Sequence, residues 1–208
     1  MEVLNSILNR RSVRKFKQDP IKKDDLIKII EAARWAPSAT NRQVCRFVVI
    51  DNEELLKKIA SETKIVFFKQ RHAAQCPAMI VVCCKGDSWI EEIGAAIQNM
   101  LLTANSLEIG SCWIGAFSRS LVRELLKIPQ NYKIYALILL GYPDETPDVP
   151  PRLSLGEICY LNEWKKPIVK PDKTLLPLSG VGSLVLRRLS NRGERDLKSS
   201  PLKIEKEK

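Results

Sequence analysis

Ala78-Met79-Ile80-Val81-Val82-Cys83-Cys84 is the apolar stretch that decides the fold class. Its length is that of a strand, and an unbroken apolar run predicts burial on both faces of a sheet. On a strand, Cys83 and Cys84 point to opposite faces and therefore cannot chelate one zinc ion together. The stretch thus predicts a buried strand and gives no indication of a structural metal.

Helical and strand patterns alternate on both sides of this stretch. Strands are expected at 47–50 and 132–140, and helices at 3–8, 24–33, 53–60, 90–104 and 121–126. Pro37 ends the second helix, and Gly110 is expected to terminate the long apolar helix. Because the elements alternate without internal repeats, the sequence predicts an α/β or α+β layer architecture.

The composition is that of one folded domain with a core. The chain has 208 residues, of which 45% are hydrophobic and 28% charged, and burial at this length covers roughly 70% of the unfolded surface. No apolar run approaches the roughly 20 residues of a membrane-spanning helix, and the first residues do not resemble a signal peptide. We therefore expect a cytoplasmic protein with no membrane partner, whose six cysteines are reduced and mostly buried.

The net charge of +10 is concentrated in one segment. Between Lys165 and Lys208 there are 12 basic and 5 acidic residues, so this segment carries +7 of the total. It lacks an apolar pattern large enough for its own core. We therefore expect a folded domain over 1–164 and a basic extension over 165–208 that packs on a partner subunit. The chain carries no motif of nucleic-acid recognition, so no nucleic-acid partner is expected.

Most catalytic and cofactor motifs are absent. The single histidine, His72, cannot form a paired-histidine metal site, and a Cys-His nucleophile would have to join it to Cys76. Gly180-Val181-Gly182 lacks the third small residue of the dinucleotide fingerprint, and no Walker loop is present. We therefore expect no bound metal and no catalytic acid or base side chain.

Three arginines near the start of the chain form a candidate anion site. Arg10, Arg11 and Arg14 lie within five residues, and Ser12 adds a hydroxyl donor. Their mutual repulsion has no structural explanation, whereas a phosphate would offset it through charge-assisted bidentate bonds. The alternative is a solvated basic face beside a helix.

Two further stretches are candidates for ligand contact. In 36–43 small residues permit close backbone approach, and Ser38, Asn41 and Gln43 can address a polar heterocycle. The alternative is a helix-terminating loop whose side chains satisfy its own backbone. In 110–117 glycines would let backbone N–H groups face a ligand, although Trp113 and Phe117 could equally be core residues.

Taken together, these stretches resemble the flavin-dependent nitroreductase family. The similarity rests on Arg10-Arg11-Ser12-Val13-Arg14, on 36–43 followed by 47–51, on 110–117, and on Gly141-Tyr142-Pro143 with Pro151-Arg152. The resemblance implies an α+β fold, a three-layer sandwich whose central mixed, mainly antiparallel sheet is flanked by helices. It also implies an intertwined homodimer that binds FMN at two sites across the subunit interface.

The resemblance further implies roles for single residues. The FMN phosphate and ribityl chain would be held by Arg10, Arg11 and Ser12, helped by Arg152. Arg14 would approach the N1/C2 edge of the ring, where a cation stabilises negative charge. The partner subunit would line the ring with Pro37, Ser38, Asn41 and Gln43, and backbone groups near Ile114 and Gly115 would face N5.

The expected activity is an NAD(P)H-dependent FMN oxidoreductase. NADH or NADPH would give a hydride to flavin N5, and a small planar acceptor, a nitroaromatic or a quinone, would take it in a ping-pong mechanism. One alternative is a specialised dehalogenase or flavin-cleaving enzyme with a basic lid over 61–76, carrying Lys64, Lys69 and Arg71, where a solvated helix is the plainer interpretation. Another is a non-enzymatic basic binding protein on the same fold.

Overall fold

The computed structural model describes residues 3–61, 64–65, 68–69, 75–86 and 90–171. The chain divides into two compact units, Met1–Asp148 and Val149–Lys208. His72, Arg71, the Gly180-Val181-Gly182 stretch and most of the basic extension lie outside the described residues. The expected boundary at residue 164 and the packing of the extension on a partner therefore stay predictions.

The first unit is built on a four-stranded sheet in the order β1-β4-β6-β5. Its strands are β1 (Cys45–Ile50), β4 (Ala78–Lys85), β5 (Gly110–Ile114) and β6 (Tyr132–Gly141). Each neighbouring pair is antiparallel, and an isolated parallel bridge beside β5 makes the sheet mixed. Residues 78–84 are buried in β4, between β1 and β6, which confirms the strand predicted from the apolar stretch.

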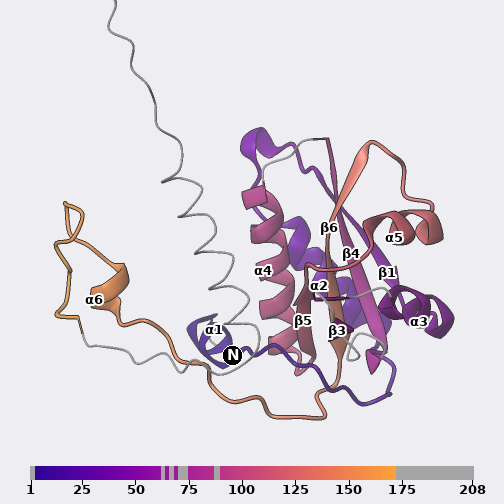
Figure 1. Ribbon diagram of the computed structural model, residues 1–208, viewed down its shortest axis with the longest axis horizontal. Coiled ribbons are helices and arrows are strands. Elements are labelled where there is room, and N and C mark those ends of the chain that lie inside the picture. The colour runs from indigo at the N-terminus through magenta and orange to yellow at the C-terminus, as the bar shows by residue number, and fades with distance from the viewer. Residues whose placement is uncertain (1–2, 62–63, 66–67, 70–74, 87–89, 172–208) are drawn as a thin grey trace, which may run out of the picture. The chain divides into compact units, whose positions relative to one another are not determined.

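Helices cover both faces of this sheet (Figure 1). One face packs on α2 (Lys23–Arg34) and α4 (Ile90–Ser106), and the other packs on α3 (Glu53–Ser61) and α5 (Arg119–Leu126). Side chains of β4 alternate between the two cores, so that Cys83 faces α3 and α5 while Cys84 faces α2 and α4. The predicted α+β three-layer arrangement is confirmed. Among the described residues, no helix is long and apolar enough to span a bilayer.

The N-terminal helix α1 (Val3–Asn9) forms where the sequence predicts it, but its apolar side chains are exposed. The exposed fractions run from 46% at Ile7 to 71% at Val3. The helix contacts α4 through a polar residue instead, because the Ser6 hydroxyl donates to the Leu102 carbonyl at 3.1 Å. In a single chain, therefore, this apolar face is not covered by the described part of the first unit.

Two expectations about local structure were wrong. Gly110 does not terminate the long helix: α4 ends at Ser106, Glu108 adopts the left-handed conformation at φ 61°, and Gly110 already belongs to β5. The segment 61–76 is not a helix at its four described central residues, which form the hairpin β2 (Lys64–Ile65) and β3 (Phe68–Lys69). The run Lys-Ile-Val-Phe-Phe-Lys is rich in β-branched and aromatic residues, which favour strands.

The second unit contains α6 (Leu155–Ile158). A capping box begins this short helix, because the Glu157 carboxylate accepts hydrogen bonds from both the backbone N–H and the hydroxyl of Ser154 at 2.9 Å. Tyr160 and Trp164 pack with their ring centroids 4.6 Å apart. Arg152 precedes this helix, is exposed, and donates to the Pro151 carbonyl at 3.2 Å.

Candidate functional site

The arginine segment, residues 10–14, follows α1 and runs along β5 at the edge of the sheet. Ser12 forms the parallel bridge with Ser111, and the N–H of Val13 donates to the Ser111 carbonyl at 2.9 Å. The N–H of Arg10 donates to the carbonyl of Ser6, in α1, at 3.0 Å. Val13 is buried, Arg10, Arg11 and Ser12 are half-buried and Arg14 is exposed. The backbone that carries them is fixed in place by β5 and α1.

The arginine segment places positive charge beside Cys112 of β5. Burial raises the pKa of the Cys112 thiol, while the charges of Arg14 and Arg10 act in the opposite direction. Both positive charges therefore act on the same residue of β5. Clustered guanidinium groups and a serine hydroxyl are the donors that bind phosphate well, so the donor set fits an anionic ligand.

Glu145, in the turn after β6, holds the end of the arginine segment. One of its carboxylate oxygens accepts hydrogen bonds from the backbone N–H groups of Arg14 and Lys15, the latter at 3.0 Å. A carboxylate bound to two backbone donors fixes the direction of the chain at Arg14. Glu145 is therefore a structural support for the segment, and the sequence analysis did not single it out.

Gly110 provides the space in which the arginine segment lies. A Cβ at this position would be 2.9 Å from Val13 Cβ and 3.0 Å from both Val13 methyl carbons. We expect Gly110→Ala to displace Val13 and to lower the free energy of unfolding by about 1–3 kcal/mol, as overpacking does. Urea unfolding measures this change.

Gly94→Ala is the matched control for Gly110→Ala. No atom lies within 4 Å of a Cβ at Gly94, which lies inside α4, where alanine is the better helix former. We expect this variant to be as stable as the wild type or more stable. Equal stability of Gly110→Ala and Gly94→Ala would contradict the predicted close packing.

The polar turn, residues 36–43, connects α2 to β1 and has a strained backbone. Its short 3-10 helix, η1 (Ala39–Asn41), includes Thr40 at φ 52°, and Asn41 and Gln43 follow at φ 56° and 48°. None of the three is glycine, and this conformation costs most residues roughly 1–2 kcal/mol, although asparagine tolerates it better than Thr40 or Gln43 do. Such conformations persist only where surrounding contacts hold them, and they cluster at functional sites.

Hydrogen bonds within the polar turn stabilise part of this geometry. The Ser38 hydroxyl accepts from the N–H of Gln43 at 3.1 Å, and the Thr40 hydroxyl donates to the Ala39 carbonyl at 2.7 Å. This is the behaviour expected of a loop whose side chains satisfy its own backbone. The sequence left open that this stretch is a loop whose side chains bind its own backbone, and this is true in part. The turn is also connected to a neighbouring helix.

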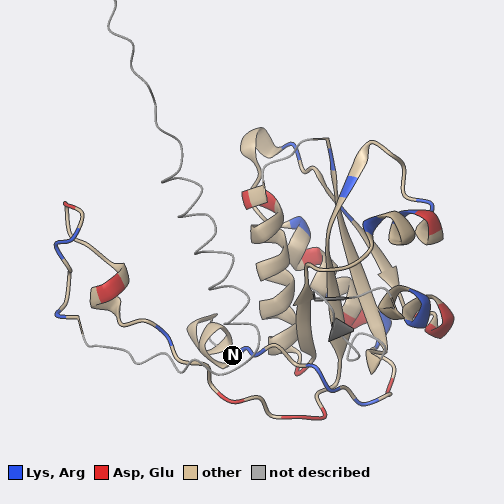
Figure 2. Cartoon of the chain, viewed as in Figure 1, with Lys and Arg blue, Asp and Glu red and all other residues tan. Residues whose placement is uncertain are grey.

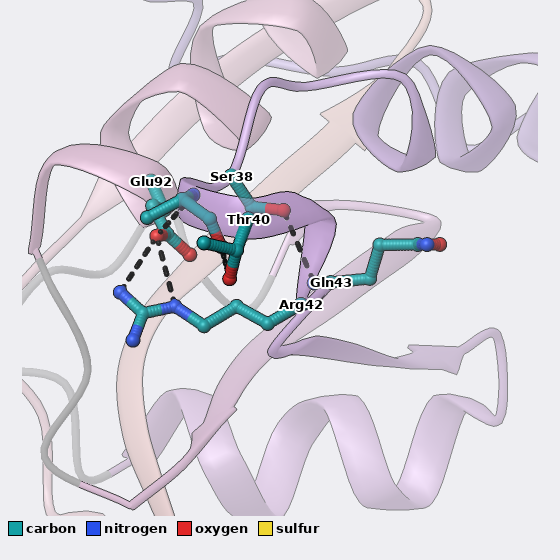
Figure 3. A network of polar contacts seen from close by, with 6 residues as sticks. Ser38, Thr40, Arg42, Gln43 and Glu92 are labelled. Atoms are coloured by element: carbon teal, nitrogen blue, oxygen red, sulfur yellow. Dashed lines mark hydrogen bonds and ion pairs between the residues drawn. The ribbon is translucent and has the colours of Figure 1, made fainter.

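That connection is made by Glu92, in the first turn of α4 (Figure 3). Its Oε1 accepts from the Ala39 N–H at 2.9 Å, from Arg42 Nη2 at 3.0 Å and from Arg42 Nε at 3.3 Å. The Ala39 N–H and the Arg42 charge together lower the pKa of the Glu92 carboxyl, although desolvation acts against them. The carboxylate is therefore ionised at neutral pH and binds the turn as an anion.

A cavity of about 550 Å³ lies beside the polar turn, between α2, α4 and the start of β1. Pro37, Ser38 and Gln43 line it, as do Arg42 and Glu92. Its size is that of a small-molecule pocket. Asn41, the fourth predicted residue of the turn, is exposed and is not among the lining residues.

The end of β5 holds the predicted backbone contacts. Ile114 is buried, whereas Gly115 is exposed and its carbonyl accepts a hydrogen bond from Arg119 at 3.2 Å. Trp113 is 47% exposed, so the expectation that it could be a core residue is wrong. Phe117 packs partly against the core and lies under the Arg119 guanidinium, 4.8 Å from the ring centroid.

The predicted residues form two half-sites on opposite edges of one sheet. The arginine segment and Ile114 lie along β5, and the polar turn leads into β1. In the strand order β1-β4-β6-β5 these are the two outer strands, and Figure 1 shows α1 near β5 with β1 on the far side. One chain therefore does not bring the two groups together. Arg152 belongs to the second unit, whose placement relative to the first is not described.

Besides Glu145, the sequence analysis missed two residues at the polar turn, Glu92 and Arg42. Arg42 lies within the polar stretch 36–43 but was given no role there, and Glu92 was not noted. A signal for Glu92 exists in the helical pattern. It lies four and eight residues before Ala96 and Met100, which are buried, so a carboxylate stands on the apolar face of the helix and requires a partner.

Proteins similar in sequence to this chain are named for activities that use flavin and nicotinamide nucleotides. An Archaeoglobus fulgidus protein assigned as an NADH dehydrogenase/NAD(P)H nitroreductase is 37% identical over 158 residues, covering 71% of this chain and 88% of that protein. A Vibrio harveyi NADPH-flavin oxidoreductase is 30% identical over 184 residues, covering 78% and 75%.

The solved structures agree with these relatives. An FMN-dependent nitroreductase from Clostridium difficile superposes with a TM-score of 0.70 at 28% identity, covering 77% of this chain and 99% of that one. The sequence profile described as the Nitroreductase family matches residues 7–82 and 65–142, which include both half-sites and all four strands of the main sheet. The chain belongs to the nitroreductase family.

Proposed function

We propose that this chain is an NAD(P)H-dependent FMN oxidoreductase whose FMN sites are each built from two copies of the chain. When bound, FMN supplies the redox chemistry, accepting a hydride from NAD(P)H at N5 and passing it to a small planar acceptor such as a nitroaromatic or a quinone, in ping-pong order. The side chains described above would bind and orient the cofactor and the substrates.

The observation that carries the proposal is the arginine segment held along β5. Arg10, Arg11 and Ser12 would bind the phosphate and ribityl chain, with Arg152 as a further donor, and Arg14 would place positive charge at the N1/C2 edge of the ring. FMN carries one phosphate, which suits a compact cluster of guanidinium groups and needs no glycine-rich pyrophosphate loop. The backbone at Ile114 and Gly115 would then face N5.

The second half-site would come from the partner. Pro37, Ser38, Asn41 and Gln43 would line the ring, and they lie at the sheet edge opposite the arginine segment. The exposed apolar face of α1 also supports a second copy, because exposed apolar patches on a folded protein commonly mark association surfaces. A homodimer with two equivalent sites satisfies both observations.

Among the described residues, the distribution of charge does not favour a nucleic-acid-binding protein. In Figure 2 α3 and α5 each carry residues of both signs. The arginine segment is a short basic cluster, and its backbone is held in a fixed position by β5 and α1. Binding of the single phosphate of a small ligand explains this short cluster better than binding of a nucleic-acid duplex does, because a duplex requires a basic stripe or face.

A visible spectrum tests the proposal. We expect the protein, reconstituted with FMN and separated from free flavin, to retain a yellow chromophore that bleaches when NADH or NADPH is added without oxygen. Bleaching identifies the class, and the faster donor identifies the nucleotide preference. A monomer that does not take up FMN at micromolar concentration would overturn the proposal.

A further inference from the structure

Glu92 is a buried carboxylate whose contacts are unevenly shared between its two oxygens. The residue is 8% exposed, and its Oε1 receives three N–H donors from the polar turn. Among the described residues, the buried Oε2 has no hydrogen-bond partner. An under-satisfied buried carboxylate is costly, so stability alone is a weak reason for this arrangement.

The geometry of the polar turn supplies a better reason. Three left-handed, non-glycine residues between positions 40 and 43 oppose the conformation that the chain prefers. The bonds from Ser38 and Thr40 lie inside the turn and move with it. The bonds from Ala39 and Arg42 join the turn to α4, whose buried face is packed against the sheet.

We propose that Glu92 is a positioning residue for the flavin: it fixes the strained polar turn to α4, so that the turn meets the ring in one geometry. This inference rests on the proposed function, because it requires that the turn contacts FMN. Glu92 would act through Ala39 and Arg42, which donate hydrogen bonds to its carboxylate. Its role is to remove the conformational freedom that binding would otherwise have to restrict.

Glu92→Gln tests this role with a change of one charge and almost no change in size. Glu91→Gln is the matched control, because Glu91 is exposed in the same helical turn. We expect Glu92→Gln to bind FMN about tenfold more weakly than the control, since a charge-assisted anchor of the turn is lost. Amide exchange at Ala39 and Gln43 in the flavin-free protein should be faster than in the control.

Two measurements at saturating FMN separate positioning from mere stabilisation of the fold. We expect the visible circular dichroism of the bound flavin to change in Glu92→Gln, and its bleaching by NAD(P)H to slow by about tenfold, because the ring is held less firmly. A residue that only stabilised the fold would leave both unchanged once the folded, flavin-loaded protein was measured.

Variants at Arg42 provide the second line of evidence. Arg42→Met should weaken FMN binding to a similar degree, and the double variant Arg42→Met/Glu92→Gln should be no weaker than the worse single variant, because both changes remove one shared anchor. If Glu92→Gln does not fold, Arg42→Lys carries the same test, since an ammonium group cannot reproduce the guanidinium geometry.

The outcomes distinguish this inference from the proposed function. A wild-type chain that binds no FMN would overturn both. A wild-type chain that binds FMN, with Glu92→Gln matching Glu91→Gln in flavin dichroism and bleaching rate, would overturn the positioning role alone. Fully additive effects at Arg42 and Glu92 would also overturn it, because they would show that the two residues act separately.

Discussion

Arg10→Gln/Arg14→Gln should abolish FMN retention, leaving a folded but colourless protein. Each charge-assisted hydrogen bond contributes roughly 1.5–3 kcal/mol, and 1.4 kcal/mol corresponds to a tenfold change in affinity. We therefore expect the dissociation constant for FMN to rise by at least about 100-fold when both guanidinium groups are lost. Quenching of flavin fluorescence during titration measures this constant.

Riboflavin, which lacks the phosphate, makes this experiment specific. In the wild type FMN should bind far more tightly than riboflavin. In the double variant this difference should shrink, because Arg10 is lost from the phosphate, whereas the loss of Arg14 from the ring edge weakens both ligands. Lys15→Gln/Lys17→Gln is the matched control, because it removes the same charge from exposed residues directly after the segment. Undiminished FMN binding in the arginine variant would place the phosphate site elsewhere and remove the main support for the proposed function.

The central elements of the fold were predictable because their sequence patterns carry the physical information. A strand buried on both faces must be apolar throughout, and the run from Ala78 to Cys84 satisfies this condition. The helix α2 was predictable for a related reason, since Asp24 and Asp25 stand in its first turn while Leu26, Ile29 and Ala33 lie on its buried face.

Other features of the fold depend on contacts between residues that are far apart in the chain, and a local sequence pattern does not predict such contacts. Gly110 was expected to end a helix because glycine commonly does so, but here its missing side chain makes room for Val13, nearly a hundred residues earlier in the chain. The apolar pattern of α1 predicted a helix correctly, yet its apolar side chains are exposed, and the polar Ser6 is buried and donates a hydrogen bond to α4. Strand order also lies outside local pattern, and it determines which residues can share one site.

The candidate site was predictable in its residue types and only partly in its architecture. The arginine segment and the polar turn were recognisable as stretches, since guanidinium clusters and small polar residues have direct chemical meanings. The left-handed backbone of the polar turn and the burial of Glu92 arise from tertiary packing. A residue that acts through other residues leaves a weak trace in a sequence, which here is one carboxylate on an apolar helical face.

If the two half-sites lie on opposite sheet edges, two variants that are defective in different half-sites should complement each other in a mixed dimer. Arg10→Gln/Arg14→Gln damages one half-site, and Pro37→Trp, a bulky change at an exposed residue, damages the other. Homodimers of either variant should lack FMN and activity. In a mixed dimer, one FMN site combines both damaged half-sites and the other site combines both intact ones. Random mixing makes half of the dimers mixed, so about a quarter of the wild-type sites should return.

Co-refolding the two variants in equal amounts, followed by measurement of bound FMN and of NAD(P)H-dependent bleaching, detects this recovery. The control mixes Arg10→Gln/Arg14→Gln with Ser12→Asp, which damages the same half-site, and it should show no recovery because every site then contains a defective arginine segment. Native mass spectrometry verifies that mixed dimers form in both cases. Mixed dimers that remain without flavin in the first mixture would show that each site is built within one chain. The opposite edges of the sheet would then need another explanation, whereas recovery near a quarter follows only if guanidinium groups from one copy and the polar turn of the other bind the same cofactor.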